Sequence, residues 1–291
     1  MPFLRRTNFD WRLRTRTLVL GSRTLILAIL NVTPDSFSDA GHFFSPEKAL
    51  DRALHLLDEG ADILDLGGES TRPNASPISP DEEQSRALPI LEAILKARPE
   101  AILSIDTFHA STAKHAIEAG AEIVNDVSGH TWDPAMSSTC AALQCGAILM
   151  HTRGTPQTWQ SLPHLAPEEI LPLVLTGLTK SVASTTAAGI PRDRIVLDPG
   201  FGFGKLGQEN YTLLARLEAL HALNLPILVG LSRKGFLTKP LPQPASSASR
   251  LHTTLAANIA AILAGAHLLR VHDPAPAREA ALIADATLAA I

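Results

Sequence analysis

Apolar runs rich in β-branched residues recur along the chain, and a segment of helical length separates each run from the next. Runs of this kind, bounded by turn residues, predict strands that are buried on both faces. The predicted strands lie at residues 25–31, 61–67, 101–107, 122–129, 146–152, 194–200, 226–233 and 267–273. The chain is therefore predicted to consist of eight repeated strand–helix units.

The segments between these runs carry the signals that begin and end helices. Ser45 and Pro46 begin the first segment, and Gly60 ends it in the manner of a left-handed C-terminal cap. Ser79 and Glu82 have the spacing of a capping box at the start of the second. These signals support the assignment of the intervening segments to helices.

Strands that alternate with helices run parallel, because each crossover returns the chain to the same edge of the sheet. Eight such units close most simply into an α/β fold of the (β/α)8 TIM barrel type, which is the fold we predict. The alternative is an open doubly wound sheet. It rests on Gly202, Gly204 and Gly207, which have the spacing of a dinucleotide-binding loop. That spacing follows the sixth strand rather than the first, so the barrel is preferred.

Composition and length fit a single globular unit. The chain has 291 residues, of which 45% are apolar and 19% charged. The Pro- and Ser-rich stretch at residues 238–249 lies inside the seventh strand–helix connection and therefore does not divide the chain. Residues 1–291 are predicted to form one domain, in which residues 1–24 are a surface-exposed, arginine-rich lead-in.

Charge, hydropathy and cysteine content narrow the classes of partner. A net charge of −4 gives no electrostatic reason to expect nucleic acid as a partner. No apolar stretch approaches the length of a membrane span, so no membrane partner is expected either. Cys140 and Cys145 make neither a disulfide framework nor a zinc-ligand set, which favours a reducing, cytoplasmic setting.

Every predicted strand ends in a side chain that forms hydrogen bonds. Taken singly, residues such as Asp65 or Asn125 are more often ordinary turn or cap residues. In a barrel, however, the strand ends meet at one rim, and a polar rim above an apolar barrel indicates an active site. The strand-end residues are Asn31, Asp65, Asp106, Asn125, His151, Asp198, Ser232 with Lys234, and Arg270 with His272.

The chemical types at this rim indicate the class of ligand. Asp106, Asn125 and Asp198 offer acceptors and one amide, which suits a flat heterocycle with amino, ring N–H and carbonyl groups. Lys234, Arg270 and His272 come from the last two strands, where barrels frequently bind phosphate. An arginine can clamp an oxyanion or stack on an aromatic plane. The alternative for Arg270 is a salt bridge to a neighbouring loop acid.

Eight segments of the chain resemble the dihydropteroate synthase family. In order they are NVTPDSFSD, DLGGESTRP, SIDTFHA, IVNDVSG, ILMHTRGTP, LDPGFGFGK, GLSRKGFL and RVHD, and they extend over nearly the whole chain. The resemblance implies a (β/α)8 transferase that condenses 6-hydroxymethyl-7,8-dihydropterin diphosphate with 4-aminobenzoate. The products would be 7,8-dihydropteroate and diphosphate, in tetrahydrofolate biosynthesis. A homodimer and a sulfonamide target are also implied.

The resemblance implies substrate-binding roles for the residues of the matching motifs. They are Thr71, Arg72, Asp106, Asn125, Asp198, Phe203, Ser232, Lys234, Arg270 and His272. The pterin would be held by Asp106, Asn125, Asp198 and Lys234. Of these, Asp106, Asp198 and Lys234 would be catalytic, together with Asn31.

The remaining implied roles concern the diphosphate and the loops. Arg270 would stack on the pterin ring, and His272 with Asn31 would face the diphosphate. Asn31 would also be the ligand of Mg²⁺, the expected cofactor. Thr71 and Arg72 would lie near the substrates, and the polar segment 32–42 that follows Asn31 is expected to be a mobile loop that closes over them.

The aminobenzoate would lie near Phe203 and Lys234, with Ser232 helping to position its pocket. The chain departs from the family pattern at Gly235, where several members carry serine, and at Asn74, where glycine is usual. Neither departure removes a proposed catalytic group.

Two other functions share parts of this pattern. A pterin-dependent methyltransferase of the same barrel family has the acidic residues that bind the pterin. It has no use for the cationic residues that would bind a departing diphosphate. A non-catalytic pterin binder is the other alternative, and the intact set Asn31, Lys234, Arg270 and His272 argues against it. In the favoured mechanism, departure of diphosphate leaves positive charge on the pterin, which Asp106 stabilises electrostatically together with Asp198.

Overall fold

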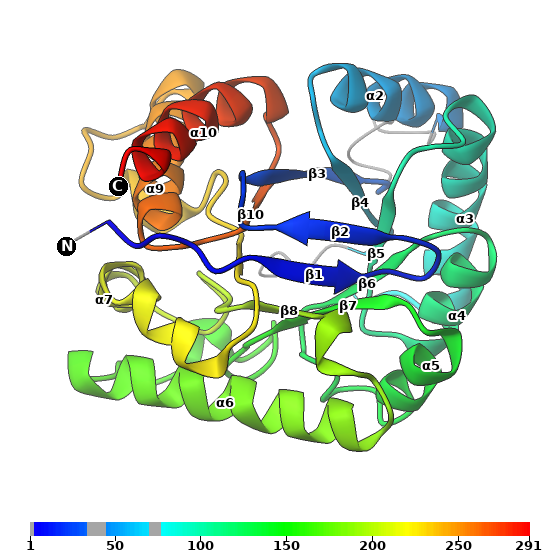
Figure 1. Ribbon diagram of the computed structural model, residues 1–291, viewed down its shortest axis with the longest axis horizontal. Coiled ribbons are helices and arrows are strands. Elements are labelled where there is room, and N and C mark those ends of the chain that lie inside the picture. Colours follow the sequence, from blue (N-terminus) through cyan, green and yellow to red (C-terminus); the bar gives the residue numbers. More distant parts are fainter. Residues whose placement is uncertain (1–2, 34–44, 70–76) are drawn as a thin grey trace.

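A computed structural model of the chain describes residues 3–33, 45–69 and 77–291 (Figure 1). Eight parallel strands form one sheet, in the order β8-β7-β6-β5-β4-β3-β10-β9. A parallel bridge between Leu197 of β8 and Ile227, next to β9, joins the two ends of this order. The sheet is therefore closed. The predicted (β/α)8 barrel is confirmed, and the open doubly wound sheet is excluded.

The barrel strands coincide with the predicted runs. They are β3 (Leu25–Asn31), β4 (Ile63–Gly67), β5 (Leu103–Asp106), β6 (Ile123–Asp126), β7 (Gly146–Met150), β8 (Ile195–Asp198), β9 (Leu228–Val229) and β10 (Leu268–Val271). Helices surround them (Figure 1). The helices are α2 (Pro46–Asp58), α3 (Pro80–Ala97), α4 (Ala110–Glu118), α5 (Met136–Leu143), α6 (Pro167–Ala187), α7 (Gln208–Ala215), α8 (Gly235–Thr238), α9 (Ser247–Leu263) and α10 (Pro274–Ala289). Short 3-10 helices lie at η1 (Trp159–Ser161), η2 (Arg192–Arg194) and η3 (Leu217–Leu223).

The predicted helix signals are present at the first two helices. At the start of α2, the Ser45 hydroxyl accepts a hydrogen bond from the Lys48 N–H at 3.4 Å. At the start of α3, the Ser79 hydroxyl accepts from the Glu82 N–H at 3.2 Å, which is one half of the predicted capping box. Gly60 follows α2 with a φ of +95°, the left-handed conformation that glycine adopts without strain.

Alternation along the strands separates an outer and an inner layer. Outward side chains pack against the helices. Inward side chains near the N-terminal ends of the strands form an apolar floor, whose members include Leu25, Leu27, Ile63, Ile123, Ile148, Val196, Leu228 and Leu268. Two residues further along their strands, the inward positions include Asp65, Asn125, Asp198 and Arg270. The interior thus changes from apolar at the floor to charged at the C-terminal mouth.

The N-terminal lead-in is exposed at many of its positions, as predicted, but it also contributes side chains to the core, which was not predicted. Its strands β1 (Phe9–Arg12) and β2 (Thr17–Leu20) form an antiparallel hairpin that lies across the barrel floor (Figure 1). Trp11 is only 1% exposed and packs, with Leu13, against the floor cluster. Its indole N–H donates to the carbonyl of Arg194 at 2.9 Å. The hairpin therefore closes the end of the barrel opposite the mouth.

This packing was not predicted because the lead-in is short and mostly polar. Each strand of the hairpin buries too few side chains for an alternating pattern to be recognised among the arginines. One arginine is itself buried: the Arg6 guanidinium donates to the Thr24 hydroxyl at 2.7 Å and to the Asp285 carboxylate at 2.6 Å. Asp285 lies 279 positions away from Arg6 in the sequence, so no local sequence pattern predicts this contact.

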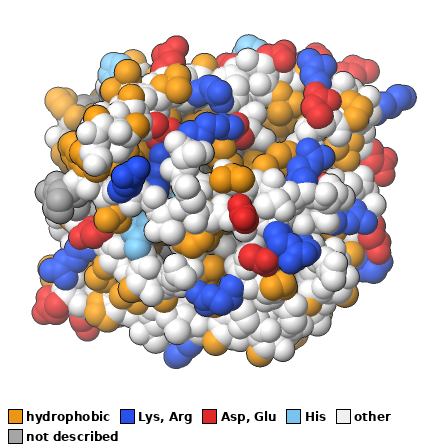
Figure 2. Space-filling view, viewed as in Figure 1, with side chains coloured by type: hydrophobic (Ala, Val, Ile, Leu, Met, Phe, Trp, Pro, Cys, Tyr) orange, Lys and Arg blue, Asp and Glu red, His pale blue; other side chains and the backbone are white. Residues whose placement is uncertain are grey.

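The face of the molecule that carries the hairpin has a mixed surface. Figure 2 shows lysine and arginine side chains interspersed with aspartate and glutamate on this side. Ion pairs such as Arg12–Asp193 and Arg23–Asp62 account for part of this mixing. Within the described ranges, no helix combines the length and the apolar character that crossing a membrane requires.

Replacing Trp11 with alanine tests the contribution of the hairpin. Loss of a buried tryptophan side chain typically costs about 3–5 kcal/mol, so the urea midpoint measured by circular dichroism should fall strongly. Val19→Ala is the control, because Val19 lies in the same hairpin and is 59% exposed. Equal midpoints for Trp11→Ala and the unmodified chain would show that the hairpin lies outside the cooperative core.

Candidate active site

Neighbouring strands place their polar ends side by side at the mouth of the barrel. Asn31 is in register with Gly67, Gly67 with Asp106, and Asp106 with Asn125. A side chain at Gly67 would begin 3.6 Å from the Asp106 carboxylate and 3.7 Å from the amide oxygen of Asn31. Gly67 therefore leaves open the space between these two groups.

Arg270 occupies the centre of the mouth. Its Nε donates to Asp65 Oδ2 at 2.7 Å, and one of its terminal nitrogens donates to Asp106 Oδ2. Asp65 is fully buried, and its Oδ2 also accepts from the Asn125 amide at 2.9 Å. Asp65 thus connects Asn125 with Arg270, and Arg270 in turn contacts Asp106. The salt bridge considered as the alternative for Arg270 does form, but to strand-end carboxylates inside the site rather than to a loop acid.

Burial from water shifts the pKa values of the charged groups at the mouth. Burial raises the pKa of Asp106 to about 7, although the positive charge of Arg270 opposes this shift. Burial also raises the pKa of Asp198, and the hydrogen bond from the Gly200 N–H, at 2.7 Å, opposes it. Burial lowers the pKa of Lys234 to about 8, with Asp198 acting in the other direction. Perturbed groups that share one cleft are typical of functional sites.

The last two loops of the barrel are joined by polar contacts. The Ser232 hydroxyl accepts from the backbone N–H of His272 at 3.2 Å and lies 2.9 Å from its ring Nδ1. The next residue, Arg233, forms a two-point ion pair with Asp273 at 2.6 and 3.1 Å. These contacts join the loops after β9 and β10, with Ser232 and His272 in direct contact.

An aromatic wall lies beside this sector. The Lys234 ammonium stands 3.9 Å from the centre of the Phe203 ring, and Phe203 meets Trp159 edge to face with ring centres 5.0 Å apart. Lys234 is half-buried, so its aliphatic stem and the Phe203 ring form a partly apolar surface at the edge of the mouth. The structure thus brings together the two residues expected near the aminobenzoate.

His151 does not join the site, which corrects the prediction for that strand end. A Cβ placed on Gly177 of α6 would stand 2.4 Å from the His151 ring, so the ring faces the helix layer. Burial lowers its pKa to about 2 and keeps it neutral, and the positive charge of Lys205 acts in the same direction. Alternation is the reason: Met150 lies two residues after the inward-facing Ile148 and so also faces inward, whereas His151 is the next position and faces outward.

The outcome for the other predicted residues is mixed. Asp106, Asn125 and Asp198 lie at the mouth, as expected. Thr71 and Arg72 lie outside the described residues, and so does most of the segment that was expected to close over the site. Asp65 was named as a strand end but not selected. Counting in steps of two from the floor residue Ile63 would have placed it inside the barrel.

The fold and the charged mouth define a pterin-binding barrel enzyme. Residues 27–272 match the family described as "Pterin binding enzyme". The dihydropteroate synthase of Bacillus subtilis is 41% identical over 266 residues, which cover 91% of this chain and 89% of that protein. The Escherichia coli dihydropteroate synthase is 40% identical over 265 residues, covering 91% and 92%.

Solved structures give the same result. The Xanthomonas albilineans dihydropteroate synthase with 4-aminobenzoic acid superposes with a TM-score of 0.88 at 37% identity, covering 97% of this chain and 99% of that one. The Yersinia pestis dihydropteroate synthase in a sulfonamide complex gives 0.88 at 37% identity, covering 97% and 100%. The chain therefore belongs to the dihydropteroate synthase family.

Two substitutions at Arg233 test how the loop after β9 is held. Arg233 has a φ of +57°, and this conformation costs a non-glycine residue about 1–2 kcal/mol. If the ion pair with Asp273 holds this backbone and thereby positions Lys234, Arg233→Ala should lower kcat/KM about tenfold, which corresponds to about 1.4 kcal/mol. Arg233→Gly should lose less, because glycine adopts this φ freely.

The steady-state constants of Arg233→Ala, Arg233→Gly and Asp273→Asn are compared in one assay. Asp273→Asn should resemble Arg233→Ala. An equal loss in the alanine and glycine variants would show that the guanidinium itself, rather than the backbone conformation, is what the enzyme needs.

Proposed function

We propose that the chain forms 7,8-dihydropteroate from 6-hydroxymethyl-7,8-dihydropterin diphosphate and 4-aminobenzoate, with release of diphosphate. The observation that carries this proposal is the convergence of Asp106, Asn125 and Asp198 with Lys234 and Arg270 at one barrel mouth. The structures of the Xanthomonas albilineans relative with 4-aminobenzoic acid and with 7,8-dihydropteroate support it.

The acidic sector matches the donor edge of a pterin. Asp106 and Asp198 are acceptors for the amino and ring N–H groups of the heterocycle. The Asn125 amide nitrogen donates to Asp65, which leaves the Asn125 oxygen as the acceptor that can serve a ligand. Asp65 therefore acts behind this surface and keeps Asn125 in one orientation.

Arg270 changes partners when the pterin binds, in our proposal. The Arg270 guanidinium forms ion pairs with both Asp65 and Asp106. A pterin that takes the Asp106 carboxylate releases one side of the guanidinium, which is then available to the ring face and to the diphosphate. Asp65 retains its contact with Nε and keeps Arg270 at the mouth.

The reaction needs charge stabilisation rather than a strong base. The bond between the pterin methylene carbon and oxygen breaks with its electron pair passing to diphosphate, and the electron-deficient carbon is stabilised by the nearby carboxylates Asp106 and Asp198. The nitrogen lone pair of 4-aminobenzoate then forms the new carbon–nitrogen bond, and the amine loses a proton to solvent. Lys234 and Arg270 stabilise the negative charge that develops on the leaving diphosphate.

Mg²⁺ is part of the proposal, with Asn31 as its protein ligand. The Asn31 amide oxygen is of the type that Mg²⁺ prefers, and it faces the open space next to Gly67. Among the described residues there is no group of three or more His, Cys, Asp or Glu side chains that could hold a metal ion. The residues thus fit an ion held mainly by substrate oxygens and water, which when bound would neutralise diphosphate charge.

We also propose that the protein forms a homodimer and works in the cytoplasm. A homodimer is supported by Leu282 and Ile283, two large apolar side chains that are exposed on α10. A cytoplasmic setting is supported by Cys140 and Cys145, which are both free thiols.

Turnover tests the proposed function directly. The chain should convert the dihydropterin diphosphate and 4-aminobenzoate to dihydropteroate, measured by chromatography of the product. Asp106→Asn and Asp198→Asn should each lower kcat by about 10²–10³, as loss of a transition-state contact does. Asp58→Asn, on the exposed surface of α2, is the matched control. A folded Asp106→Asn or Asp198→Asn variant with near-normal turnover would remove the role assigned here.

Arg270→Ala tests the anion sector separately. The variant should lose about 1.5–3 kcal/mol of binding to the pterin diphosphate, as expected for a charge-assisted contact. It should lose less for the free pterin alcohol, because the alcohol lacks the anion. Calorimetry of both ligands with Mg²⁺ measures the difference. Equal losses would mean that Arg270 acts on the ring alone.

A further inference from the structure

The glycines with the spacing of a dinucleotide-binding loop serve a different purpose in this fold. They lie in the connection between β8 and α7, and Gly202, Gly204 and Gly207 all have positive φ angles, of +81°, +70° and +43°. A Cβ on Gly204 would stand 2.1 Å from the carbonyl oxygen of Arg153, in the loop after β7. Gly204 therefore allows two loops at the barrel mouth to pack backbone against backbone.

Lys205 fills the space between these two loops. It is only 3% exposed, and its ammonium donates to the carbonyls of His151 at 3.0 Å, Gly200 at 2.8 Å and Phe203 at 3.2 Å. An ammonium has three N–H donors, so all of them are used by backbone oxygens. Burying a charge is costly unless hydrogen bonds compensate it. A lysine at this position therefore needs a reason beyond packing.

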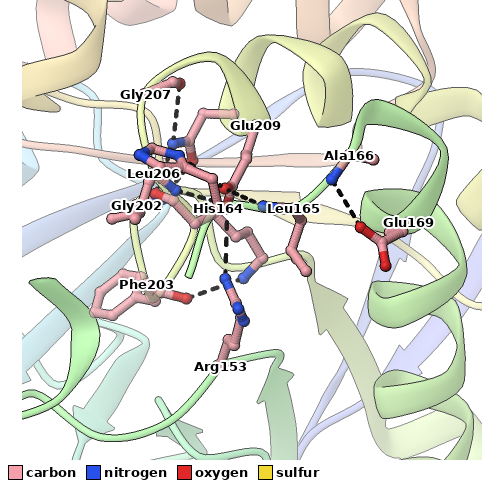
Figure 3. Close-up of polar contacts among 12 residues, drawn as sticks. Arg153, His164, Leu165, Ala166, Glu169, Gly202, Phe203, Leu206, Gly207 and Glu209 are labelled. Carbon is pink, nitrogen blue, oxygen red and sulfur yellow. Dashed lines mark hydrogen bonds and ion pairs between the residues drawn. The ribbon is translucent and has the colours of Figure 1, made fainter. Parts of the chain in front are cut away.

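The carbonyls that Lys205 holds belong to peptides next to the substrate site. The Gly200 N–H donates to the Asp198 carboxylate at 2.7 Å, so the Gly200 residue is held by Lys205 on one side and holds Asp198 on the other. The Phe203 carbonyl accepts from Lys205 and from the Arg153 N–H at 3.3 Å (Figure 3). Lys205 is thus linked to the Asp198 carboxylate through Gly200, and it contacts the backbone of Phe203 in the aromatic wall directly.

Other buried polar side chains hold the outer part of the same loop. The Glu209 carboxylate accepts from the Leu165 N–H at 3.0 Å and the Leu206 N–H at 2.8 Å (Figure 3). The Asn210 amide donates to the Lys205 carbonyl at 2.8 Å and accepts from the Gly202 N–H at 2.7 Å. These contacts account for the shape of the loop, whereas those of Lys205 lead to residues that face the substrates.

We propose that Lys205 is a positioning residue, whose buried ammonium fixes the loops after β7 and β8 so that Asp198 faces the pterin and Phe203 faces the aminobenzoate. This inference rests on the proposed function. The role is geometric: no atom of Lys205 needs to contact a substrate, and its effect passes through the carbonyls of Gly200 and Phe203. Its positive charge also favours the ionised form of Asp198.

The test variant is Lys205→Met, which keeps an unbranched side chain of similar length and removes the charge and the donors. A displacement of about 1 Å at a reacting group can cost about 100-fold in rate. We therefore expect a lower kcat and a KM for 4-aminobenzoate raised about tenfold, equivalent to about 1.4 kcal/mol. Lys180→Met, an equal chemical change at an exposed position of α6, should have unchanged constants.

A double-mutant cycle with Phe203→Ala shows whether Lys205 acts through that residue. Once the ring is absent, Lys205→Met should raise the KM for 4-aminobenzoate much less than it does in the unmodified chain, because contacting residues couple. Additive effects would contradict positioning through Phe203. If Lys205→Met does not fold, Lys205→Gln, which keeps two N–H donors, takes its place in the cycle.

The outcomes separate this inference from the function on which it rests. No product from the unmodified chain would overturn the proposed function and this inference together. Product from the unmodified chain, with unchanged kcat and KM in a folded Lys205→Met variant, would overturn the positioning role alone. Failure of both Lys205 variants to fold would assign the residue to stability and would likewise overturn that role.

Discussion

The ion pairs of Arg270 with Asp65 and Asp106 are the interactions on which the site depends. The barrel interior is apolar at its floor, and the next inward layer carries carboxylates that are largely shielded from water. A carboxylate in such a place is tolerated only when hydrogen bonds and opposite charges compensate it. Removing one partner of a buried pair typically costs about 3–5 kcal/mol, because the other charge is left uncompensated. Arg270 supplies compensation for Asp65 and Asp106, and Asn125 adds a hydrogen bond to Asp65 Oδ2.

The buried carboxylates and cations at the mouth also suit a ligand that is polar at one end and anionic at the other. Burial raises the pKa of Asp106 to about 7 and lowers that of Lys234 to about 8, so both groups are readily influenced by what binds beside them. A heterocycle that donates hydrogen bonds stabilises the carboxylates, and an anion stabilises the cations. Because these groups are already oriented by Asp65, Gly200 and the floor, little reorganisation is needed when charge develops during the reaction.

The sequence predicts the barrel well, because apolar runs, caps and glycine ends all point to repeated strand–helix units. It predicts the site residues correctly only where the alternation of inward and outward side chains along each strand is taken into account. Asp65 lies two residues after Ile63 and faces the interior, whereas His151 follows Ile148 by three and faces the helices. Both orientations could be predicted from the two-residue repeat of side-chain direction along a strand. The contact between Arg270 and Asp65 could not be predicted in this way. The two residues are 205 positions apart in the sequence, and only closure of the barrel brings them together.

The glycine-rich loop after β8 shows why a spacing alone does not define a binding site. In a dinucleotide-binding loop, free backbone N–H groups point at the phosphates. In this chain the Gly200 N–H is taken by Asp198 and the Gly202 N–H by Asn210, each at 2.7 Å. The carbonyls of Gly200 and Phe203, together with that of His151 in the loop after β7, converge on the cation of Lys205. The partners of the backbone groups therefore distinguish a loop that binds a phosphate from one that holds other residues in place.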